Sequence, residues 1–174
     1  GTNAELHCVD ERIVGRKPRT LDFAQAAAMP LTTITAWEAL FDRLQLPQQA
    51  DGAAAAGQGA GTLLITAGAG GVGSVAIQLA KALTGARVVA TASRPESRAQ
   101  ALALGADLVL DHAQPLAPQL AAAGICWVER VFSITHTDRH FADLAACIAP
   151  FGRLCAIDEC GPIDVRLLKP RSAS

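Results

Sequence analysis

This 174-residue chain is poor in the residue types that mark several classes of binding protein. It has no tyrosine, only 4% of its residues are aromatic, and 18% are charged, with a net charge of -1. Because nucleic acids and anionic membranes select basic surfaces, this balance gives no electrostatic reason to expect either as a partner. No apolar run reaches the roughly 18 residues that span a bilayer, so we expect a soluble protein.

Residue constellations typical of metal sites and hydrolases are also lacking. The five cysteines include no CxxC pair, and the closest two, Cys155 and Cys160, have four residues between them. Free thiols in a reducing, cytoplasmic environment are therefore favoured over a metal site. The carboxylates are scattered, and no serine stands in a His/Asp constellation. His136 has two readings, as a proton donor or as a loop histidine that hydrogen-bonds locally.

What the chain does contain, from residue 62 onward, is an alternation of apolar strands and helical segments. The expected strands are 63–67, 87–92, 107–110, 128–134 and 153–157, and the main expected helices are 72–83, 96–104 and 139–148. Strands that are apolar throughout are typical of a parallel sheet covered on both faces. We therefore predict an α/β fold with a doubly wound parallel sheet (Rossmann), in three α/β/α layers with strand order 3-2-1-4-5.

The part before this alternation is expected to hold two helices, 21–29 and 32–44, separated at Pro30. Residues 47–61, rich in Gly and Gln, are expected to form a loop. The chain starts without a methionine on an extended segment and stops soon after an expected strand. We therefore expect a part of a longer polypeptide.

A glycine-rich turn follows the first expected strand, in the segment TLLITAGAGGVGSVAIQLAKAL. Gly68, Gly70 and Gly73 satisfy the G-x-G-x-x-G pattern between a strand and a helix, as dinucleotide-binding turns do. In that reading Gly68 permits a tight turn, Gly70 admits the pyrophosphate, and Gly73 lets helix and strand pack closely. A purely structural glycine turn is the alternative.

The residues after the second expected strand indicate which dinucleotide would bind. An NAD site usually has a carboxylate about 20 residues beyond the glycines, but this chain has Ser93 and Arg94 there. A serine hydroxyl together with Arg94 and Arg98 suits a 2′-phosphate, so NADP is favoured over NAD. The alternative is that Arg94 and Arg98 are solvated residues at the start of a helix.

These residues resemble a known family. AGAGGVGSVAIQLAKAL, TASRPESRAQALALGADLVLDH and VFSITHTDRHFADLAACIAPFGRLCAIDE are similar to the cofactor domain of medium-chain dehydrogenases/reductases, in the quinone-oxidoreductase-like branch often called zinc-type alcohol dehydrogenase-like. AAAMPLTTITAWEALFDRL resembles the helices that precede this domain. The likeness covers essentially the whole chain.

The resemblance implies a domain plan and a set of cofactor contacts. Residues 1–20 would be the end of a GroES-like catalytic domain or a linker, and 21–174 an NADP-binding Rossmann domain truncated at its C-terminal end. Homodimers are common in the family. The residues implied in cofactor binding are Gly68, Gly70, Gly71, Val72, Gly73, Ser93, Arg94, Arg98, His112, Ser133 and Thr135, together with Thr33 or Thr35.

One departure from the family concerns zinc. Zinc-dependent members have a metal-binding cysteine just before the helix expected at 32–44, where this chain has Met29, Pro30 and Leu31. Thioether and apolar side chains do not suit Zn²⁺, so we predict no zinc in this chain.

Three functions are consistent with the sequence. The leading hypothesis is an NADPH-dependent oxidoreductase that transfers hydride to a quinone or an α,β-unsaturated carbonyl, with this segment inactive alone because the substrate-side domain is missing. A zinc-dependent alcohol dehydrogenase and a non-catalytic NADP-sensing domain are the alternatives. No catalytic residue is identified.

Overall fold

The computed structural model describes residues 4–49 and 60–174, and the chain divides into two compact units, Gly1–Leu31 and Thr32–Ser174. The first unit contains the short 3-10 helix η1 (Glu11–Ile13), which Asp10 caps by accepting a hydrogen bond from the Arg12 backbone at 2.9 Å. None of its described residues is buried. The predicted role of residues 1–20 as the end of a further domain stays a prediction.

Helix α1 (Phe23–Trp37) is continuous, so the predicted break at Pro30 is wrong. A proline removes one backbone donor and strains the preceding turn, but the neighbouring helical hydrogen bonds can carry the helix past it. The boundary between the two units falls directly after Leu31, one residue beyond this proline. A π-helix, η2 (Glu38–Arg43), continues α1 within the second unit. The predicted loop at 47–61 lies mostly outside the described residues.

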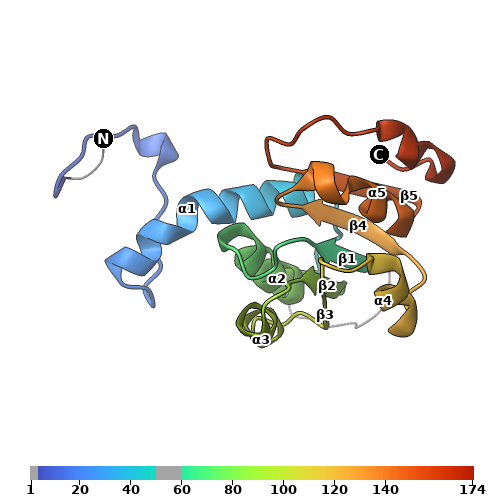
Figure 1. Ribbon diagram of the computed structural model, residues 1–174. Helices are drawn as coiled ribbons and strands as arrows, with labels where there is room; N and C mark the ends of the chain where they lie inside the picture. The colour runs from blue at the N-terminus through green and yellow to red at the C-terminus, as the bar shows by residue number, and fades with distance from the viewer. Residues whose placement is uncertain (1–3, 50–59) are drawn as a thin grey trace. The chain divides into compact units, whose positions relative to one another are not determined.

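The second unit is built on five parallel strands, which confirms the predicted fold class and strand order. The strands are β1 (Thr62–Ile65), β2 (Arg87–Thr91), β3 (Leu108–Leu110), β4 (Val128–Ser133) and β5 (Ile148–Ala156). Their order in the sheet is β3-β2-β1-β4-β5, with β1 at the centre between β2 and β4 (Figure 1).

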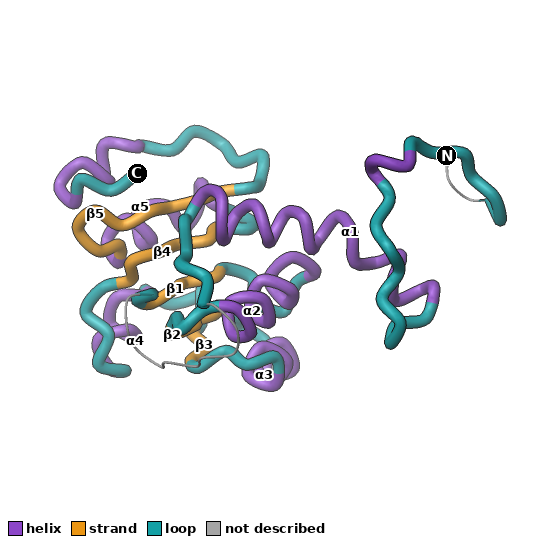
Figure 2. The backbone as a smooth tube through the Cα atoms, turned by 180° about the vertical axis from the view of Figure 1, so that it is seen from behind, coloured by secondary structure: helices purple, strands orange, loops and turns teal. Residues whose placement is uncertain are grey.

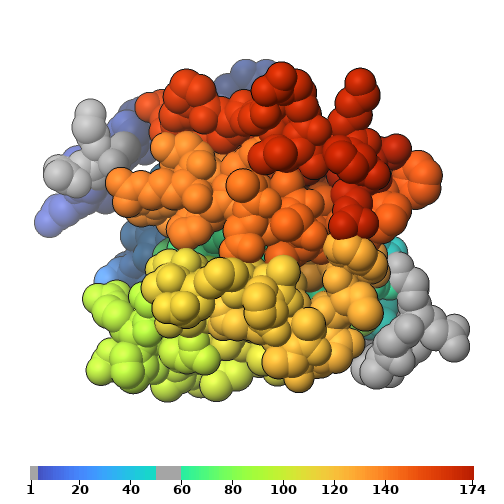
Figure 3. All heavy atoms as spheres, turned by 45° about the vertical axis from the view of Figure 1, so that its right-hand side comes forward, coloured from blue at the N-terminus to red at the C-terminus, as the bar shows by residue number. Residues whose placement is uncertain are grey.

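Helices cover both faces of this sheet. They are α2 (Gly71–Leu83), α3 (Pro95–Ala103), α4 (Leu116–Ala122), α5 (Thr137–Cys147) and the 3-10 helix η3 (Val165–Arg171). Seen from behind, the strands lie between α2 and α3 on one side and α4 on the other (Figure 2). Figure 3 shows the outer surface of the α4–α5 layer, with η3 beside it in red.

Two hydrophobic cores follow from the alternation of side chains along the central strands. Leu63 and Ile65 point to the core shared with α2 and η2, which includes Ile77 and Leu40. The intervening Leu64 points to the other core, whose members include Leu116, Leu120, Leu144 and Ile148. Every strand of a doubly wound sheet needs apolar residues on both faces, which explains the unbroken apolar runs in the sequence.

β5 differs from its prediction, because it begins at Ile148 rather than near residue 153. Pro150 and Gly152 lie within the strand, at an irregularity in the pairing with β4 where Phe151 adopts a left-handed conformation (φ 60°). Bulges of this kind let a strand bend without ending.

Within the described residues, no helix combines the length and the apolar character needed to cross a membrane.

Candidate cofactor site

The turn between β1 and α2 is fastened to the end of β2. Its left-handed residue is Ala67 (φ 51°), whose backbone N–H donates to Thr91 Oγ1 at 3.1 Å, and Gly68 N–H donates to the Thr91 carbonyl at 3.0 Å. Gly68 itself does not have a positive φ, so the turn does not depend on the backbone freedom of glycine at this position. The Thr91 side chain is buried and holds the turn in place from the neighbouring strand.

Close packing, rather than backbone freedom, requires glycine at two positions of the turn. A Cβ on Gly73 would lie 2.4 Å from the Ala67 carbonyl oxygen, and a Cβ on Gly68 would lie 2.7 Å from Ala90 Cβ. Neither separation is sterically tolerable. Gly73 therefore lets α2 start against the end of β1, as the glycine pattern predicts.

The first turn of α2 faces the carboxyl ends of the strands with unshielded backbone donors. The helix begins after Gly70, and its first turn contains no acidic residue. The first N–H groups of any helix lack helical partners and carry the positive end of the dipole, so Gly71, Val72 and Gly73 present a site for an anion. The Ser74 hydroxyl is directed inward, donating to the Gly70 carbonyl at 2.7 Å.

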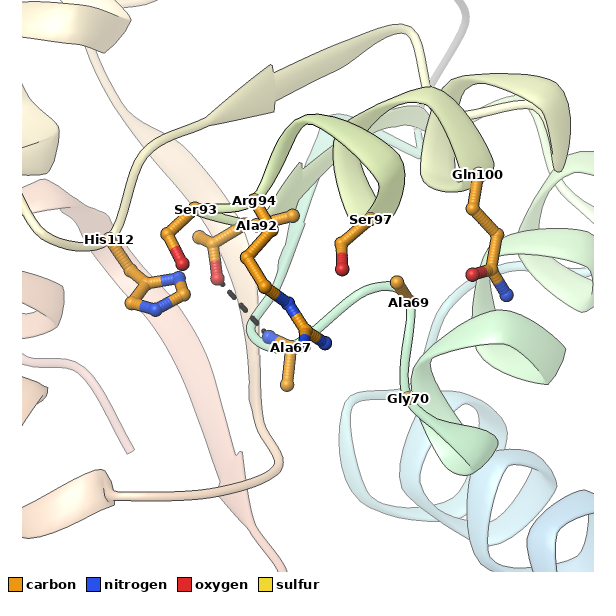
Figure 4. A pocket seen from close by; sticks show the side chains of 10 residues that line it. Ala67, Ala69, Gly70, Ala92, Ser93, Arg94, Ser97, Gln100 and His112 are labelled. Atoms are coloured by element: carbon orange, nitrogen blue, oxygen red, sulfur yellow. Dashed lines mark hydrogen bonds between the residues drawn. The ribbon is translucent and has the colours of Figure 1, made fainter.

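Beside this turn lies an open cavity of about 390 Å³, between the end of β2 and the start of α3. Figure 4 shows the Arg94 side chain extending from the start of α3 across the cavity toward Ala67, with Ser97 beside it. The residues that line the cavity are Ala67, Ala69, Gly70, Thr91, Ala92, Ser93, Arg94, Ser97, Gln100 and His112. Among the described residues that line it, none is acidic and Arg94 is the one permanent cation.

Arg98 does not join Arg94 in the cavity. Its guanidinium donates to the Ala92 carbonyl at 3.2 Å and to the Val109 carbonyl at 3.0 Å, across the ends of β2 and β3. Residues 94 and 98 are one helical turn apart, but Arg94 precedes the helix and its side chain leaves in another direction. The geometry gives Arg98 a structural role, and direct phosphate binding by Arg98 stays an untested prediction.

A narrow pocket of about 40 Å³ continues from the cavity toward the ends of β3 and β4. His112, Thr91 and Ala67 line both spaces, and the narrow pocket is completed by Thr66, Leu116, Thr135, His136 and His140. His112 Nδ1 is buried without a hydrogen-bond partner among the described residues. The ring of His112 packs edge-on against that of His140, with centroids 5.8 Å apart.

Among the groups that line the narrow pocket, His140 has a lowered pKa. Burial lowers the pKa of His140, and the neighbouring His112 and His136 lower it further, while Asp143 acts in the opposite direction. His136 takes a left-handed backbone (φ 53°), and its Nδ1 lies 2.9 Å from the Thr135 hydroxyl oxygen. This contact agrees with the interpretation of His136 as a loop histidine that hydrogen-bonds locally. A role of His136 as a proton donor stays an untested prediction.

The end of β4 is closed by hydrogen bonds among its own side chains. Ser133 is fully buried, and its hydroxyl lies 2.7 Å from that of Thr137. The Thr137 hydroxyl donates to Asp158, which also accepts the Thr137 backbone N–H at 3.0 Å. Burial raises the pKa of Asp158, but these hydrogen bonds outweigh it and leave the pKa below its ordinary value. The structure therefore does not bring Ser133 into the cavity, whereas Thr135 reaches the narrow pocket.

The threonines of α1 occupy different surroundings. The Thr33 hydroxyl is buried and makes no hydrogen bond within the described residues, and it lines neither of the two spaces above. Thr35 lines a separate open pocket beside the end of β5, with Ala156 and Ile157. The Thr32 methyl group lies 3.3 Å from the place where a Cβ on Gly71 would stand, so α1 from Thr32 onward lies beside the first turn of α2.

Three polar residues of the cavity were missed by the sequence analysis: Thr91, Ser97 and Gln100. Ser97 and Gln100 are three positions apart in α3, a spacing that places them on the same side of the helix. That periodicity was a usable signal for them. Thr91 had no such signal, because a threonine inside an apolar strand is common.

Among the described residues, the cysteines are unpaired and the possible metal ligands do not cluster. Burial raises the pKa of Cys147 to about 12, and burial also raises the pKa of Cys155. All five cysteines are free. Among residues 4–49 and 60–174, no group of three His, Cys, Asp or Glu side chains could hold a metal ion.

The parallel sheet and its glycine turn define a Rossmann-type domain. Residues 71–158 match the model of the family described as zinc-binding dehydrogenase, and the chain belongs to this family. A zinc-type alcohol dehydrogenase-like protein from Staphylococcus epidermidis is 35% identical over 178 residues, covering 100% of this chain and 50% of that protein. A crystal structure from Rhizobium etli CFN 42, provisionally described as a zinc-dependent alcohol dehydrogenase, has 54% identity and a TM-score of 0.87, covering 99% of this chain and 49% of that one.

Two further relatives carry the name of a cofactor. An NADPH-dependent alkenal/one oxidoreductase from Arabidopsis thaliana is 41% identical over 112 residues, which is 64% of this chain and 26% of that protein. The quinone oxidoreductase of Thermus thermophilus, solved also with NADPH, has 31% identity and a TM-score of 0.69, covering 90% of this chain and 46% of that one. The chain spans about half the length of the first relatives it matches.

Proposed function

We propose that this chain is the NADPH-binding part of an oxidoreductase that transfers hydride to a quinone or an α,β-unsaturated carbonyl compound. The observation that carries the proposal is the open cavity in which the glycine turn and Arg94 face each other. One side offers backbone donors for a diphosphate, and the other offers a guanidinium and the Ser93 hydroxyl for a second phosphate.

The residues present fit NADP(H) better than NAD(H). The glycine turn, in which a Cβ at Gly73 would fill the space where helix and strand meet, suits either dinucleotide, so the choice depends on the residues after β2. An NAD site would hold the ribose 2′-hydroxyl with a carboxylate, and no described residue lining this cavity has one. Glu96, the nearest acidic residue in the sequence, lies in the first turn of α3 and does not line the cavity.

When bound, the cofactor would supply a hydride from its nicotinamide ring. The part of this chain is to bind and orient it: the first turn of α2 holds the diphosphate, and Arg94 with Ser93 holds the 2′-phosphate. Fixing donor and acceptor in line lowers the entropic cost of the reaction. The acceptor class is proposed by analogy with the Arabidopsis and Thermus relatives, whose names specify alkenal/one and quinone.

Two experiments test this proposal. Titration of the chain with NADPH and with NADH should show tighter binding of NADPH, and equal affinity would contradict the cofactor assignment. A hydride-transfer assay of the longer polypeptide against a panel of quinones and enones should show NADPH oxidation. We expect the 174-residue chain alone to bind NADPH without turnover. Three further statements stay predictions: that a catalytic domain belongs to the same polypeptide, that the intact protein forms a homodimer, and that it is cytoplasmic.

A zinc-dependent alcohol dehydrogenase is the second candidate, because the family model and the Rhizobium structure carry that description. The part of α1 where Met29 and Leu31 stand does not offer zinc a thiolate or imidazole. Elemental analysis of the longer polypeptide purified without added metal would decide between the two, since stoichiometric zinc together with alcohol oxidation would favour this candidate.

A further inference from the structure

The carboxyl end of β2 is the place where the two parts of the candidate site meet. Thr91 is the last residue of β2 and accepts hydrogen bonds from the glycine turn. Ser93 and Arg94 follow Thr91 directly along the chain, separated from it only by Ala92. The turn proposed to hold the diphosphate and the residues proposed to hold the 2′-phosphate are therefore both tied to Thr91.

Ala67 is the residue of the turn that depends on Thr91. It is not a glycine, yet it adopts a left-handed backbone (φ 51°), a conformation that is strained for residues with a Cβ atom. A strained conformation persists only where the surrounding structure holds it in place. Here the Thr91 hydroxyl accepts the Ala67 N–H at 3.1 Å, the bond drawn as a dashed line in Figure 4.

The conformation of Ala67 decides where the first N–H groups of α2 stand. The Ala67 carbonyl accepts the Gly70 N–H at 2.9 Å, and a Cβ at Gly73 would lie 2.4 Å from the same oxygen. Because α2 begins directly after Gly70, the start of this helix lies against the Ala67 carbonyl. A change in the backbone of Ala67 would therefore displace the N–H groups of residues 71–73 relative to β2.

Thr91 itself is held firmly in the sheet. It is only 1% exposed, and β2 pairs with β1 on one side and with β3 on the other. The next N–H group, that of Ala92, donates to the Leu110 carbonyl at 2.9 Å, so the strand is fixed up to the residue before Ser93. Thr91 is thus a fixed point between a strained turn and the residues proposed to bind the 2′-phosphate.

We infer that Thr91 is a positioning residue for cofactor selectivity: its hydroxyl sets the separation between the first turn of α2 and Arg94, so that one ligand reaches both. The inference rests on the proposed function, because it assumes that these two parts hold the diphosphate and the 2′-phosphate. A ligand with two anchor points gains from the second only when the spacing of the two sites matches its own. Thr91 therefore supports the preference for NADPH through the turn, without a contact of its own to the phosphates.

The test is Thr91→Val, which keeps the shape of the side chain and the backbone acceptor but removes the hydroxyl. The Ala67 N–H then loses its partner, and the strained turn relaxes. NADPH should bind about tenfold more weakly, whereas NADH, which lacks the second anchor, should change by no more than about twofold. Calorimetric titration of the 174-residue chain with both dinucleotides is the measurement.

Two small ligands separate positioning from a general loss of the site. Adenosine 2′-monophosphate offers only the 2′-phosphate anchor, and inorganic pyrophosphate offers only the diphosphate anchor. Because each occupies one part of the site, their affinities should be the same for the unmodified chain and for Thr91→Val. Titration followed by NMR chemical shifts can measure such weak binding.

Two further variants make the test independent of the folding of a single protein. Thr91→Ser retains the hydroxyl and should keep the preference for NADPH. Thr91→Ala also removes the hydroxyl and should lower the NADPH affinity as Thr91→Val does. Circular dichroism should confirm that the variants used for titration are folded.

Thr84→Val is the matched control. Thr84 is also a buried threonine whose hydroxyl accepts a backbone N–H, that of Ala86 at 3.2 Å, and it donates to the Ala80 carbonyl at 2.6 Å. It precedes the amino end of β2, at the opposite edge of the sheet from the candidate site. Its loss should destabilise the fold at least as much as Thr91→Val, but the affinities for NADPH and NADH should stay unchanged.

The outcomes distinguish this inference from the proposed function. Unchanged NADPH affinity in Thr91→Val and Thr91→Ala, or equal losses for NADPH and NADH, would overturn the inference and leave the proposed function standing. A loss of NADPH affinity in Thr84→Val as large as in Thr91→Val would do the same. If the unmodified chain binds no NADPH, or binds NADPH and NADH equally, the proposed cofactor assignment fails and the inference fails with it.

Discussion

The two halves of the sheet's carboxyl edge are built differently. At the ends of β2 and β3, Arg94, Ser93 and His112 surround an open cavity, and His112 Nδ1 has no partner among the described residues. At the end of β4, Ser133, Thr137 and Asp158 bond to one another. Polar residues at strand ends therefore serve two purposes here: one half keeps its groups available for a ligand, and the other uses them to hold the start of α5.

Mutations should separate the two halves, because binding and stability depend on different residues. The largest effect is expected for Gly73→Ala, since the added Cβ would stand 2.4 Å from the Ala67 carbonyl oxygen. Either α2 moves away or the turn distorts, and overpacking of this kind costs about 2–3 kcal/mol of stability. Chemical denaturation and NADPH titration should both show the loss. Gly15→Ala is the control, because a Cβ at Gly15 meets nothing within 4 Å, and equal behaviour of the two variants would contradict the steric argument.

Arg94→Ala should weaken NADPH binding about 50-fold and leave NADH binding nearly unchanged. A guanidinium–phosphate contact is a charge-assisted, bidentate interaction, and only NADPH carries the 2′-phosphate. The free energy of unfolding should not change, because the Arg94 side chain is exposed. Calorimetric titration with both cofactors is the measurement, and an equal loss for NADPH and NADH would show that Arg94 does not contact the 2′-phosphate.

Asp158→Asn tests the half of the edge at the end of β4. It should cost about 1–2 kcal/mol of stability, because Asp158 accepts two hydrogen bonds from Thr137 at the start of α5. A carboxylate there also interacts favourably with the helix dipole. NADPH affinity should stay the same. If denaturation shows no loss, or if the cofactor affinity falls strongly, the division into two halves is wrong.

The contribution of Asp158 should also depend on pH. Because its pKa in the folded state lies below the ordinary value of about 3.9, the stabilisation is fully present above that pH and is lost as the pH falls through the folded-state pKa. The stability difference between the unmodified chain and Asp158→Asn should therefore be constant near neutral pH and shrink below about pH 4. Urea denaturation from neutral pH down to about pH 3 would measure it, and a difference that grew toward acid would contradict the sign.

The smallest effect is expected for Arg98→Ala, which should cost about 1 kcal/mol of stability and leave the NADPH/NADH affinity ratio unchanged. Its guanidinium bonds the carbonyls of Ala92 and Val109 at the ends of two strands, on the binding half but outside the cavity. Together with Arg94→Ala it forms a matched pair of arginines within one helical turn. A large loss of NADPH selectivity in Arg98→Ala would restore its predicted role in phosphate binding.

The fold was largely readable from the sequence, and the site only in part. Apolar strands such as 63–67, separated by helical periodicity, led to the observed strand order, because few topologies satisfy right-handed crossovers. The helix break predicted at Pro30 proved wrong, because the neighbouring helical hydrogen bonds carry α1 past the proline, and β5 begins earlier than predicted. Arg94 and Arg98 are equivalent in the sequence, and only the direction of each side chain distinguishes them.

The sequence by itself determined the class of this protein and indicated where its candidate site lies, because glycine spacing, strand–helix alternation and the lack of a carboxylate after β2 are local properties. The tertiary structure decided which polar groups are available to a ligand. The Ser133 hydroxyl is hydrogen-bonded to that of Thr137, and the Arg98 guanidinium donates to two backbone carbonyls. His112 Nδ1, by contrast, has no hydrogen-bond partner among the described residues. Some partners are close in sequence, such as Ser133 and Thr137, and others are distant, such as Thr137 and Asp158; in both cases the folded backbone decides which groups meet.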